Sequence, residues 1–358
     1  MPRNYQETSG FKADLNNMQP VRVLITVPDL EGESEIIKQI EAISDRLDVR
    51  FKPCKTNIET ADILKDVEVL YTQTPPNHLD YANRLRWVQL CFTGVDNKVE
   101  NPMFDPHRKI TVTNGAGAHA VAISEYCMAA MGILTRNLLQ FFRDQQSTIR
   151  DRCHSPVLDL HRKTLCIVGY GQIGREVARL ASVYHMRILA VDPNPDWRTS
   201  SGFQWPGVGD PQGKFPKEFF TPGQLHQALE QSDYVVCCAP LTPKTKNLFS
   251  HQEFDTMKSG AYFIHVGRGP TLDDMALAKA LENGSIAGAA IDVFASDPDP
   301  LPPDHPMWTL DNAYISPHVS GNRNRAYFQK MNDILCENLH QYLKGESLFN
   351  VVTRQRGY

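Results

Sequence analysis

The stretch Leu165-Cys166-Ile167-Val168-Gly169-Tyr170-Gly171-Gln172-Ile173-Gly174 joins an apolar run to three glycines in the spacing GxGxxG. An apolar strand pattern precedes the glycines, and an amphipathic helical pattern follows them to Tyr184. The next β-rich run stops at Asp192, 18 positions after the last glycine. A strand, a glycine-rich turn, a helix and an acidic strand end are the parts of a nucleotide-binding βα unit. The stretch therefore predicts an open parallel sheet.

Each residue of this turn has a physical task in binding a dinucleotide. Gly169 permits the tight turn, Gly171 lets the backbone approach the pyrophosphate, and Gly174 allows close contact between helix and strand. Gln172 and Ile173 open the helix, so their free N–H groups and the positive end of the helix dipole face the phosphates. All five residues are predicted cofactor contacts.

Asp192 distinguishes the two nicotinamide dinucleotides. Its carboxylate can accept hydrogen bonds from both hydroxyls of the adenine ribose, and it would repel a 2′-phosphate. The following Pro193-Asn194-Pro195 offers no cation, and Arg198 is the nearest one in sequence. We therefore predict NAD as the cofactor, with NADP as the less favoured alternative.

The composition argues against several other classes of protein. The 358 residues are 41% hydrophobic and 22% charged, with a net charge of −4, so no nucleic-acid or membrane partner is expected. No apolar run has the length of a membrane span, and the polar first 20 residues lack the core of a signal peptide. The eight cysteines lack metal-ligand spacing, so neither a metal site nor a disulfide scaffold is predicted. We expect a cytoplasmic protein.

Strands alternate with helical patterns along almost the whole chain, which is typical of parallel α/β architecture. The predicted strands are 21–27, 67–71, 85–90, 110–113, 165–168, 187–191, 234–238, 261–266, 286–293 and 313–316. The predicted helices are 36–47, 118–142, 172–184, 223–230, 275–282 and 322–343. Thr271-Leu272-Asp273-Asp274 is interpreted as a capping box that opens the helix at 275.

The position of the glycine motif near mid-chain indicates a leading domain ahead of the cofactor domain. We predict two doubly wound parallel-sheet domains, Rossmann-like and flavodoxin-like, with a cleft at the carboxyl ends of the strands. The predicted substrate domain is discontinuous, residues 1–117 plus 319–358, and the NAD-binding Rossmann domain is 118–318. The Gly-, Pro- and aromatic-rich stretch 193–222 is predicted to be a surface insertion, with a lid or a subunit contact as the alternative.

Four further segments resemble the D-isomer-specific 2-hydroxyacid dehydrogenase family, and its glyoxylate and hydroxypyruvate reductases in particular. They are Cys91-Phe92-Thr93-Gly94-Val95-Asp96-Asn97, His265-Val266-Gly267-Arg268-Gly269, Asp292-Val293-Phe294-Ala295-Ser296-Asp297-Pro298 and Ser316-Pro317-His318-Val319-Ser320-Gly321. The resemblance covers roughly residues 65–352. It implies a homodimeric oxidoreductase that interconverts a 2-oxo acid and a D-2-hydroxy acid by hydride transfer.

The chemistry of that reaction gives three residues distinct tasks. The neutral imidazole of His318 can take the hydroxyl proton and return it in the reductive direction. A carboxylate on the far ring nitrogen fixes the tautomer, and this task falls to Asp297. Arg268 has the planar guanidinium that holds a substrate carboxylate. Taken singly, each residue also has a structural explanation, as a strand-end histidine, a solvated loop cation and a turn aspartate.

Other predicted contacts come from backbone and strand ends. The N–H groups of the loop that contains Thr93, Gly94 and Val95 can bind the substrate carboxylate, because glycine permits close approach. The remaining predicted cofactor contacts are Ala239, Pro240, Val266, Gly267 and Asp292. The resemblance implies that Asp292 lies near the nicotinamide end.

The chain departs from the family pattern at Asp297, where glutamate is usual. The shorter side chain would lengthen its contact with His318 by about 1 Å unless the loop compensates. Glyoxylate, hydroxypyruvate, pyruvate-like and aryl 2-oxo acids all stay open as substrates. The alternative function is an NAD-sensing protein-interaction module, similar to the transcriptional corepressors built on this fold, with little catalysis.

Overall fold

The structure is a computed structural model that describes residues 19–27, 33–54, 62–95, 98, 100–150, 157–194, 196, 199–200, 202–321 and 325–354. The chain divides into two compact units. Unit 1 comprises residues 1–118, 201–203 and 323–358, and unit 2 comprises residues 119–200 and 204–322. Each unit is built on its own parallel sheet, so the predicted class of two doubly wound α/β units is confirmed.

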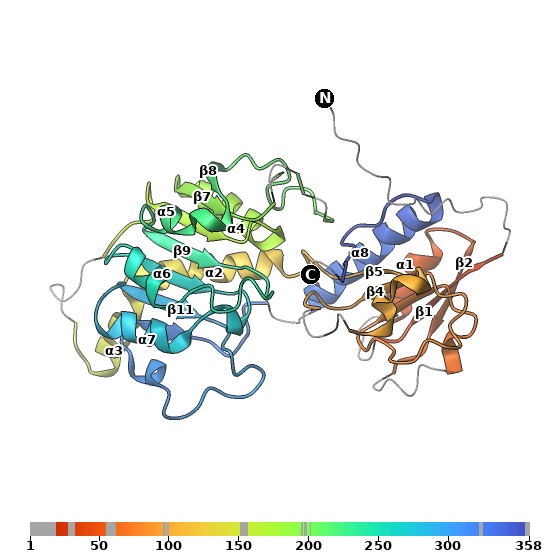
Figure 1. Cartoon of the computed structure of the whole chain (residues 1–358), viewed down its shortest axis with the longest axis horizontal. Helices are drawn as coiled ribbons and strands as arrows, with labels where there is room; N and C mark the ends of the chain where they lie inside the picture. Colours follow the sequence, from red (N-terminus) through yellow and green to blue (C-terminus); the bar gives the residue numbers. More distant parts are fainter. Residues whose placement is uncertain are drawn as a thin grey trace. The chain divides into compact units, whose positions relative to one another are not determined.

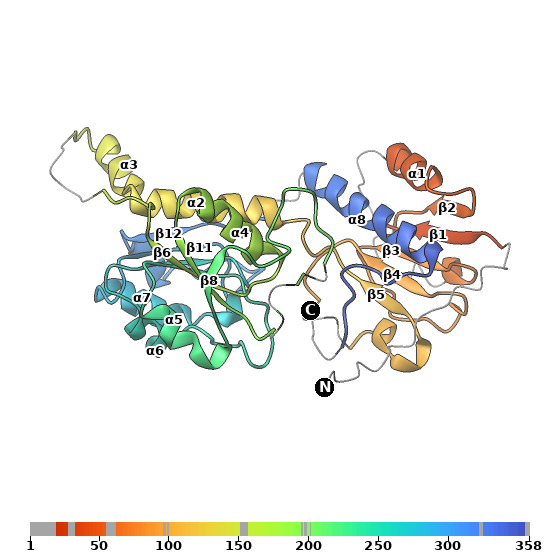
Figure 2. The ribbon, with the colours of Figure 1, turned by 90° about the horizontal axis from the view of Figure 1, so that it is seen from above.

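Unit 1 contains a five-stranded parallel sheet in the order β2-β1-β3-β4-β5 (Figure 1). Its strands are β1 (Val21–Ile25), β2 (Leu47–Phe51), β3 (Val69–Thr72), β4 (Trp87–Leu90) and β5 (Thr111–Thr113). Its helices are α1 (Glu33–Glu41), α8 (Arg325–Lys344) and the short η2 (Asp62–Leu64), η3 (Pro102–Phe104) and η4 (Pro106–Arg108). Helices α1 and α8 lie on the same side of the sheet (Figure 2). The strand order is that of flavodoxin-like folds.

A buried polar network joins this sheet to helix α8. Trp87 Nε1 donates a hydrogen bond to Thr113 Oγ1 at 2.7 Å, and the Thr113 hydroxyl donates to Gln89 Oε1 at 2.7 Å. Asn338 of α8 donates to the same Gln89 oxygen at 3.2 Å and accepts from the N–H of Phe349 at 2.7 Å. Because buried polar groups are costly without partners, this network fixes how α8 and the segment after it lie on the sheet.

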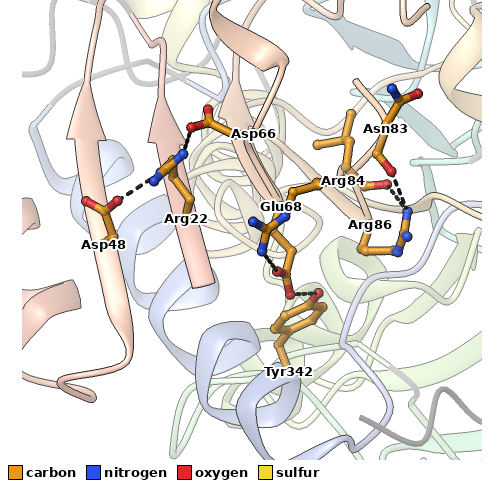
Figure 3. A network of polar contacts seen from close by, with 9 residues as sticks. Arg22, Asp48, Asp66, Glu68, Asn83, Arg84, Arg86 and Tyr342 are labelled. Atoms are coloured by element: carbon orange, nitrogen blue, oxygen red, sulfur yellow. Dashed lines mark hydrogen bonds and ion pairs between the residues drawn. The ribbon is translucent and has the colours of Figure 1, made fainter. Parts of the chain in front are cut away.

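A second set of polar contacts lies near the amino-terminal ends of the same strands (Figure 3). Arg22 of β1 pairs with Asp48 of β2 at 2.8 Å and also with Asp66. Tyr342 of α8 donates to Glu68 at 2.7 Å, and burial raises the pKa of this phenol well above its ordinary value. These contacts attach the strands and α8 at the edge opposite to the predicted substrate loop.

Unit 2 contains a seven-stranded parallel sheet in the order β12-β11-β10-β9-β6-β7-β8. Its strands are β6 (Thr164–Val168), β7 (Arg187–Val191), β8 (Pro216–Phe220), β9 (Tyr234–Cys237), β10 (Tyr262–His265), β11 (Gly288–Ile291) and β12 (Ala313–Ile315). Numbered within the unit, this is the Rossmann order extended by one strand, and it reverses between β6 and β9. Ligands of such sheets bind at the carboxyl ends next to that reversal.

Helices cover both faces of this sheet (Figure 2). The helices of this unit are α2 (Ala120–Thr135), α3 (Leu138–Gln146), α4 (Gln172–Val183), α5 (Leu225–Leu229), α6 (His251–Thr256), α7 (Asp274–Glu282) and the short η5 (Pro222–Gln224), η6 (Gly269–Thr271) and η7 (Pro306–Thr309). Leu165 and Ile167 belong to the core that α2 and α4 close, whereas Cys166 and Val168 belong to the core under α5, α6 and α7. Because both faces are buried, β6 is apolar throughout rather than alternating.

The predicted continuous helix over 118–142 is wrong in one respect. The structure ends α2 at Thr135 and begins α3 at Leu138, with Asn137 between them at φ +53°. Asparagine tolerates this left-handed conformation, which no helix interior accommodates. An apolar periodicity that continues through Asn137 therefore conceals a change of direction.

Smaller corrections concern element ends. Leu47, which the helical stripe included, begins β2 instead. Asp273 caps α7 by accepting from the N–H of Ala276 at 3.0 Å, so Thr271 is not the cap. The elements β2, β8 and α6 are absent from the predicted set, and β8 lies inside the stretch 193–222 that the sequence predicts as an insertion.

Candidate active site

The candidate residues of unit 2 follow the ends of six of its strands. Gly169 to Gly174 follow β6, Asp192 follows β7, Ala239 and Pro240 follow β9, Val266, Gly267 and Arg268 follow β10, Asp292 and Asp297 follow β11, and His318 follows β12. All strand pairs of this sheet are parallel, so these ends share one edge. The strand topology thus places the predicted site residues of unit 2 along the same edge of the sheet.

The three glycines of the turn have different reasons to lack a side chain. Gly169 has φ +96°, and a Cβ there would lie 3.0 Å from the backbone of Ala239. A Cβ on Gly174 would lie 2.2 Å from the Gly169 carbonyl oxygen and 2.9 Å from Cγ2 of Ile167. A Cβ on Gly171 would meet no atom within 4 Å. Gly171 therefore faces open space at the start of α4, where no side chain caps the helix, and this fits a bound pyrophosphate.

Asp192 is oriented by two backbone N–H groups. Its Oδ2 accepts from the N–H of Tyr170 at 2.8 Å, and its Oδ1 accepts from the N–H of Asn194 at 2.9 Å. Each carboxylate oxygen has a further lone pair for a ribose hydroxyl. Arg198, the nearest cation in sequence and the residue that would favour NADP, lies outside the described residues.

Strand β10 ends in a buried histidine that links two loops. One ring nitrogen of His265 lies 3.3 Å from the carbonyl oxygen of Val293, and the other lies 2.9 Å from Oγ1 of Thr271. The Thr271 hydroxyl also donates to the Arg268 carbonyl oxygen at 2.7 Å. Burial lowers the pKa of His265 to about 4. The buried His265 therefore contacts both the Arg268 loop, at Thr271, and the segment that follows Asp292, at Val293.

The Arg268 loop packs tightly against neighbouring backbone. A Cβ on Gly267 would lie 2.7 Å from the Ala239 carbonyl oxygen, and one on Gly269 would lie 1.9 Å from the Phe294 carbonyl oxygen. The half-buried Arg268 donates from Nη1 to the Gly267 carbonyl oxygen at 3.0 Å. The close backbone contacts of Gly267 and Gly269 thus fix the backbone position from which the Arg268 side chain extends.

His318 and Asp297 are brought together. His318 Nδ1 lies 3.1 Å from Asp297 Oδ2, so the aspartate reaches the ring despite its shorter side chain. The same carboxylate oxygen accepts from the N–H of Phe294 at 3.2 Å. The His318 side chain is 56% exposed, which leaves Nε2 accessible to a ligand. With the proton on Nδ1, Nε2 is the nitrogen able to exchange a proton.

The structure places the buried Asp292 under the loop that contains His318. Its Oδ1 accepts from the Ser316 hydroxyl at 2.5 Å and from the N–H of Val319 at 2.9 Å, and its Oδ2 accepts from the N–H of Ser320 at 2.9 Å. Tyr126 of α2 hydrogen-bonds the Ser316 hydroxyl at 2.7 Å. Asp292 thus orients this loop, and its predicted contact with the cofactor stays a prediction.

Three residues have supporting roles that the sequence does not predict. They are Tyr126, Thr271 and Asp292, the last of which binds the loop of His318. Thr271 and Asp292 lie within or beside the quoted motifs, so their proximity in sequence was a usable signal. Tyr126 is 190 positions from Ser316, and only the fold brings them together.

The predicted substrate loop follows β4 in unit 1. Asn114 Nδ2 donates to the Thr93 carbonyl oxygen at 2.8 Å, and the Thr93 hydroxyl donates to the Gly115 carbonyl oxygen at 3.2 Å. Within the described part of the chain, the N–H groups of Thr93, Gly94 and Val95 donate no hydrogen bond. Asp96 and Asn97 of the same motif lie outside the described residues.

Among the described residues, no group of three or more His, Cys, Asp or Glu side chains is placed to hold a metal ion. No helix among them is both long and apolar enough to cross a membrane.

The strand orders of the two sheets, the glycine-rich turn and the polar residues at the edge of unit 2 define a class, the two-domain proteins built on a Rossmann dinucleotide fold. A family model described as D-isomer specific 2-hydroxyacid dehydrogenase, NAD binding domain, matches residues 128–320. The chain belongs to the D-isomer-specific 2-hydroxyacid dehydrogenase family.

Curated relatives bear two different names. A glyoxylate reductase of Thermofilum pendens is 34% identical over 272 residues, which cover 75% of each protein. A D-3-phosphoglycerate dehydrogenase of Methanocaldococcus jannaschii is 28% identical over 337 residues. That match covers 93% of this chain but 59% of the relative, so the chain spans less than two thirds of that protein.

Solved structures show the same fold with either dinucleotide. The D-lactate dehydrogenase of Lactobacillus jensenii, with NAD⁺, has a TM-score of 0.68 and 20% identity over 93% of this chain and all of that one. An NADPH-dependent glyoxylate/hydroxypyruvate reductase of Sinorhizobium meliloti, with NADP and sulfate, has a TM-score of 0.71 and 19% identity over 94% of this chain and all of that one. These neighbours therefore leave the choice between NAD and NADP open.

Two alanine substitutions separate the roles of the glycines. Gly171→Ala adds a Cβ in open space at φ −82°, so we expect normal stability and a Kd for NADH raised by roughly tenfold or more. Gly174→Ala places a Cβ against backbone, so we expect a loss of about 3 kcal/mol in the free energy of unfolding. Urea denaturation and fluorescence titration with NADH measure the two effects. Equal losses of stability in both variants would contradict this assignment.

His265 should make stability depend on pH. Its folded pKa lies below the ordinary 6.5, so between about pH 6.5 and pH 4 the unfolded chain binds a proton that the folded chain does not. This contribution to stability is intact above that window and falls by about 3 kcal/mol as pH drops through it. Denaturant titrations of wild type and His265→Asn at pH 7 and pH 4.5 should show a smaller pH effect in the variant. The exposed His251→Asn should keep the wild-type dependence, and an unchanged dependence in His265→Asn would refute the prediction.

Proposed function

We propose that this protein is an NAD-dependent oxidoreductase that interconverts a 2-oxo acid and a D-2-hydroxy acid, acting mainly as a 2-oxo acid reductase. The observation that carries the proposal is the His318–Asp297 pair, with Nδ1 and Oδ2 3.1 Å apart, at the sheet edge that also bears the glycine-rich turn. An oriented imidazole beside a dinucleotide site is the arrangement that transfer of a proton together with a hydride requires.

The chain's own residues then have definite roles. Bound NADH supplies the hydride to C2 of the oxo acid. Arg268 holds the substrate carboxylate with two parallel N–H bonds and draws charge from the carbonyl oxygen. His318, protonated at Nε2, gives that proton to the oxygen as it becomes a hydroxyl, and Asp297 stabilises the imidazolium before the transfer. In the oxidative direction Nε2 takes the proton back.

Dinucleotide binding is assigned to Gly169, Gly171, Gln172, Ile173, Gly174, Asp192, Ala239, Pro240, Val266, Gly267 and Asp292. The carboxylate of Asp192, which the N–H groups of Tyr170 and Asn194 orient, supports NAD over NADP, because a 2′-phosphate beside it would be repelled. We assign residues 118–318 to the NAD-binding domain and residues 1–117 with 319–358 to the substrate domain. Thr93, Gly94 and Val95 of the latter bind the substrate carboxylate through backbone N–H groups. The protein is cytoplasmic in this proposal.

Turnover with a panel of 2-oxo acids tests the proposal. We expect NADH oxidation with at least one of glyoxylate, hydroxypyruvate, pyruvate and phenylpyruvate, and a higher kcat/KM with NADH than with NADPH. His318→Ala should lower kcat by roughly 10²- to 10⁴-fold and leave the Kd for NADH nearly unchanged. Asp297→Asn should lower kcat as well, and Asp297→Glu should restore part of it.

Two results would go against these assignments. An unaltered protein that binds NADH but turns over none of the four acids would favour the NAD-sensing interaction module. A His318→Ala variant with most of its activity would remove His318 from the mechanism.

We also propose a homodimer that uses helix α3. Its side chains Leu138, Phe141 and Phe142 are 48%, 38% and 63% exposed, which is unusual for large apolar groups so close together. Light scattering after gel filtration should give twice the chain mass, and Phe142→Ser should shift it toward the monomer. Exposed Val183→Ser, on α4, is the matched control, and a wild-type monomer would end this proposal.

A further inference from the structure

The stretch between β7 and β8 contacts the nucleotide-binding turn of unit 2. Its residues 199–200 and 204–215 belong to the same compact unit as β6 and α4. Three turns shape it, at Gly207, Gly209 and Gly213, all with positive φ. Residues 199, 200 and 204–215, called here the 199–215 segment without residues 201–203, contact the first two turns of α4.

Asp210 is the hub of these contacts. The residue is 2% exposed, and its Oδ2 accepts from the Tyr170 hydroxyl at 2.6 Å and from the N–H of Phe215 at 3.1 Å. Its Oδ1 accepts from the N–H of Lys214 at 2.8 Å. One buried carboxylate therefore both shapes the segment and binds the side chain of the residue between Gly169 and Gly171.

Arg175 of α4 connects to the segment through two carbonyl groups. Its guanidinium donates to the Asp210 carbonyl oxygen at 2.5 Å and to the Thr199 carbonyl oxygen at 3.1 Å. It also lies 4.9 Å from the centroid of the Tyr170 ring. Arg175 is 3% exposed, so these bonds and the nearby Asp210 and Asp192 carboxylates offset the cost of burying its charge.

Two more contacts reach the same helix. The N–H of Gly209 donates to the buried carboxylate of Glu176 at 2.5 Å. Gln204 donates from Nε2 to Oε1 of Gln172, the first residue of α4, at 3.1 Å. The segment thus binds α4 at positions 172, 175 and 176, all within its first two turns.

We propose that the 199–215 segment is a fixed support of the dinucleotide site and that Asp210 is its positioning residue. Tyr170 is held at both ends, its N–H by Asp192 and its hydroxyl by Asp210. The peptide groups on either side of Tyr170 therefore keep the orientation that a pyrophosphate meets. The proposal rests on the proposed function only in that a dinucleotide binds at this turn.

The support acts on one half of the dinucleotide. Asp192 and the glycine turn serve the adenine ribose and the pyrophosphate. Loss of the support should therefore weaken the binding of ADP-ribose and NADH by the same factor, because both contain that half. Oxo-acid binding is assigned in the proposed function to other residues, Arg268 and His318.

Binding titrations test the proposal without any measurement of turnover. Tyr170→Phe removes one hydroxyl, and Asp210→Asn neutralises its partner. We expect each to raise the Kd of ADP-ribose and of NADH about tenfold. The double variant should bind about as weakly as Asp210→Asn alone, because the Tyr170 hydroxyl is one of the donors to Asp210 and its contact is already weakened in that variant. Gln204→Ala, which breaks a more exposed contact, should raise the Kd by a smaller factor.

Matched controls lie near the opposite edge of the same sheet. Tyr262→Phe changes a tyrosine that begins β10, and Asp233→Asn changes an aspartate that accepts from the N–H of Thr164. Both should leave the Kd of ADP-ribose unchanged. Thermal unfolding of every variant separates lost folding from lost binding.

The outcomes are distinct. If wild type binds neither ADP-ribose nor NADH, the proposed function fails. If wild type binds and Tyr170→Phe, Asp210→Asn and Gln204→Ala bind equally well, the segment is only structural and this proposal is overturned, whatever their melting temperatures. If Asp210→Asn does not fold, Tyr170→Phe and Gln204→Ala still decide the question.

Discussion

Helix α4 lies so close to strand β6 that position 174 has no room for any side chain. An added Cβ would lie 2.2 Å from the Gly169 carbonyl oxygen. Glycine is therefore the residue that fits at position 174 while the helix lies this close to the turn. The start of α4 lies at the carboxyl edge of the sheet, because the helix follows β6 after a turn of three residues. The other candidate residues of unit 2 lie at the same edge, because each follows a strand that pairs in parallel with β6 or with its neighbours.

Buried polar groups then hold the loops at that edge in place. Asp292 holds the loop of His318, His265 contacts Thr271 in the loop of Arg268, and Asp210 holds the segment beside Tyr170. In each case a group that would be costly to bury alone is satisfied by backbone or hydroxyl partners from another strand end. Hydrogen bonds to buried polar side chains therefore order the loops of the site, in addition to apolar packing.

Much of this organisation could be predicted from the sequence, because it depends on local patterns. The glycine spacing, the apolar β6 and the carboxylate at Asp192 predict the Rossmann unit, and motif order predicts which strand ends come next. Other features could not be predicted. The break at Asn137 falls within an unbroken apolar pattern, and the contact of Tyr126 with Ser316 joins residues 190 positions apart. The 199–215 segment has no periodicity, so its attachment to α4 depends on turns and buried charges that only the fold brings together.

The backbone of His318 has φ +55°, a conformation in which a side chain on Cα costs about 1 kcal/mol and glycine costs nothing. The N–H groups of Val319 and Ser320 donate hydrogen bonds to Asp292 and hold the chain there regardless. A search for stabilising substitutions that ranked positions by backbone preference alone would select this one and replace the imidazole with glycine. Under the proposed function, selection for catalysis and selection for thermal stability oppose each other at this single residue.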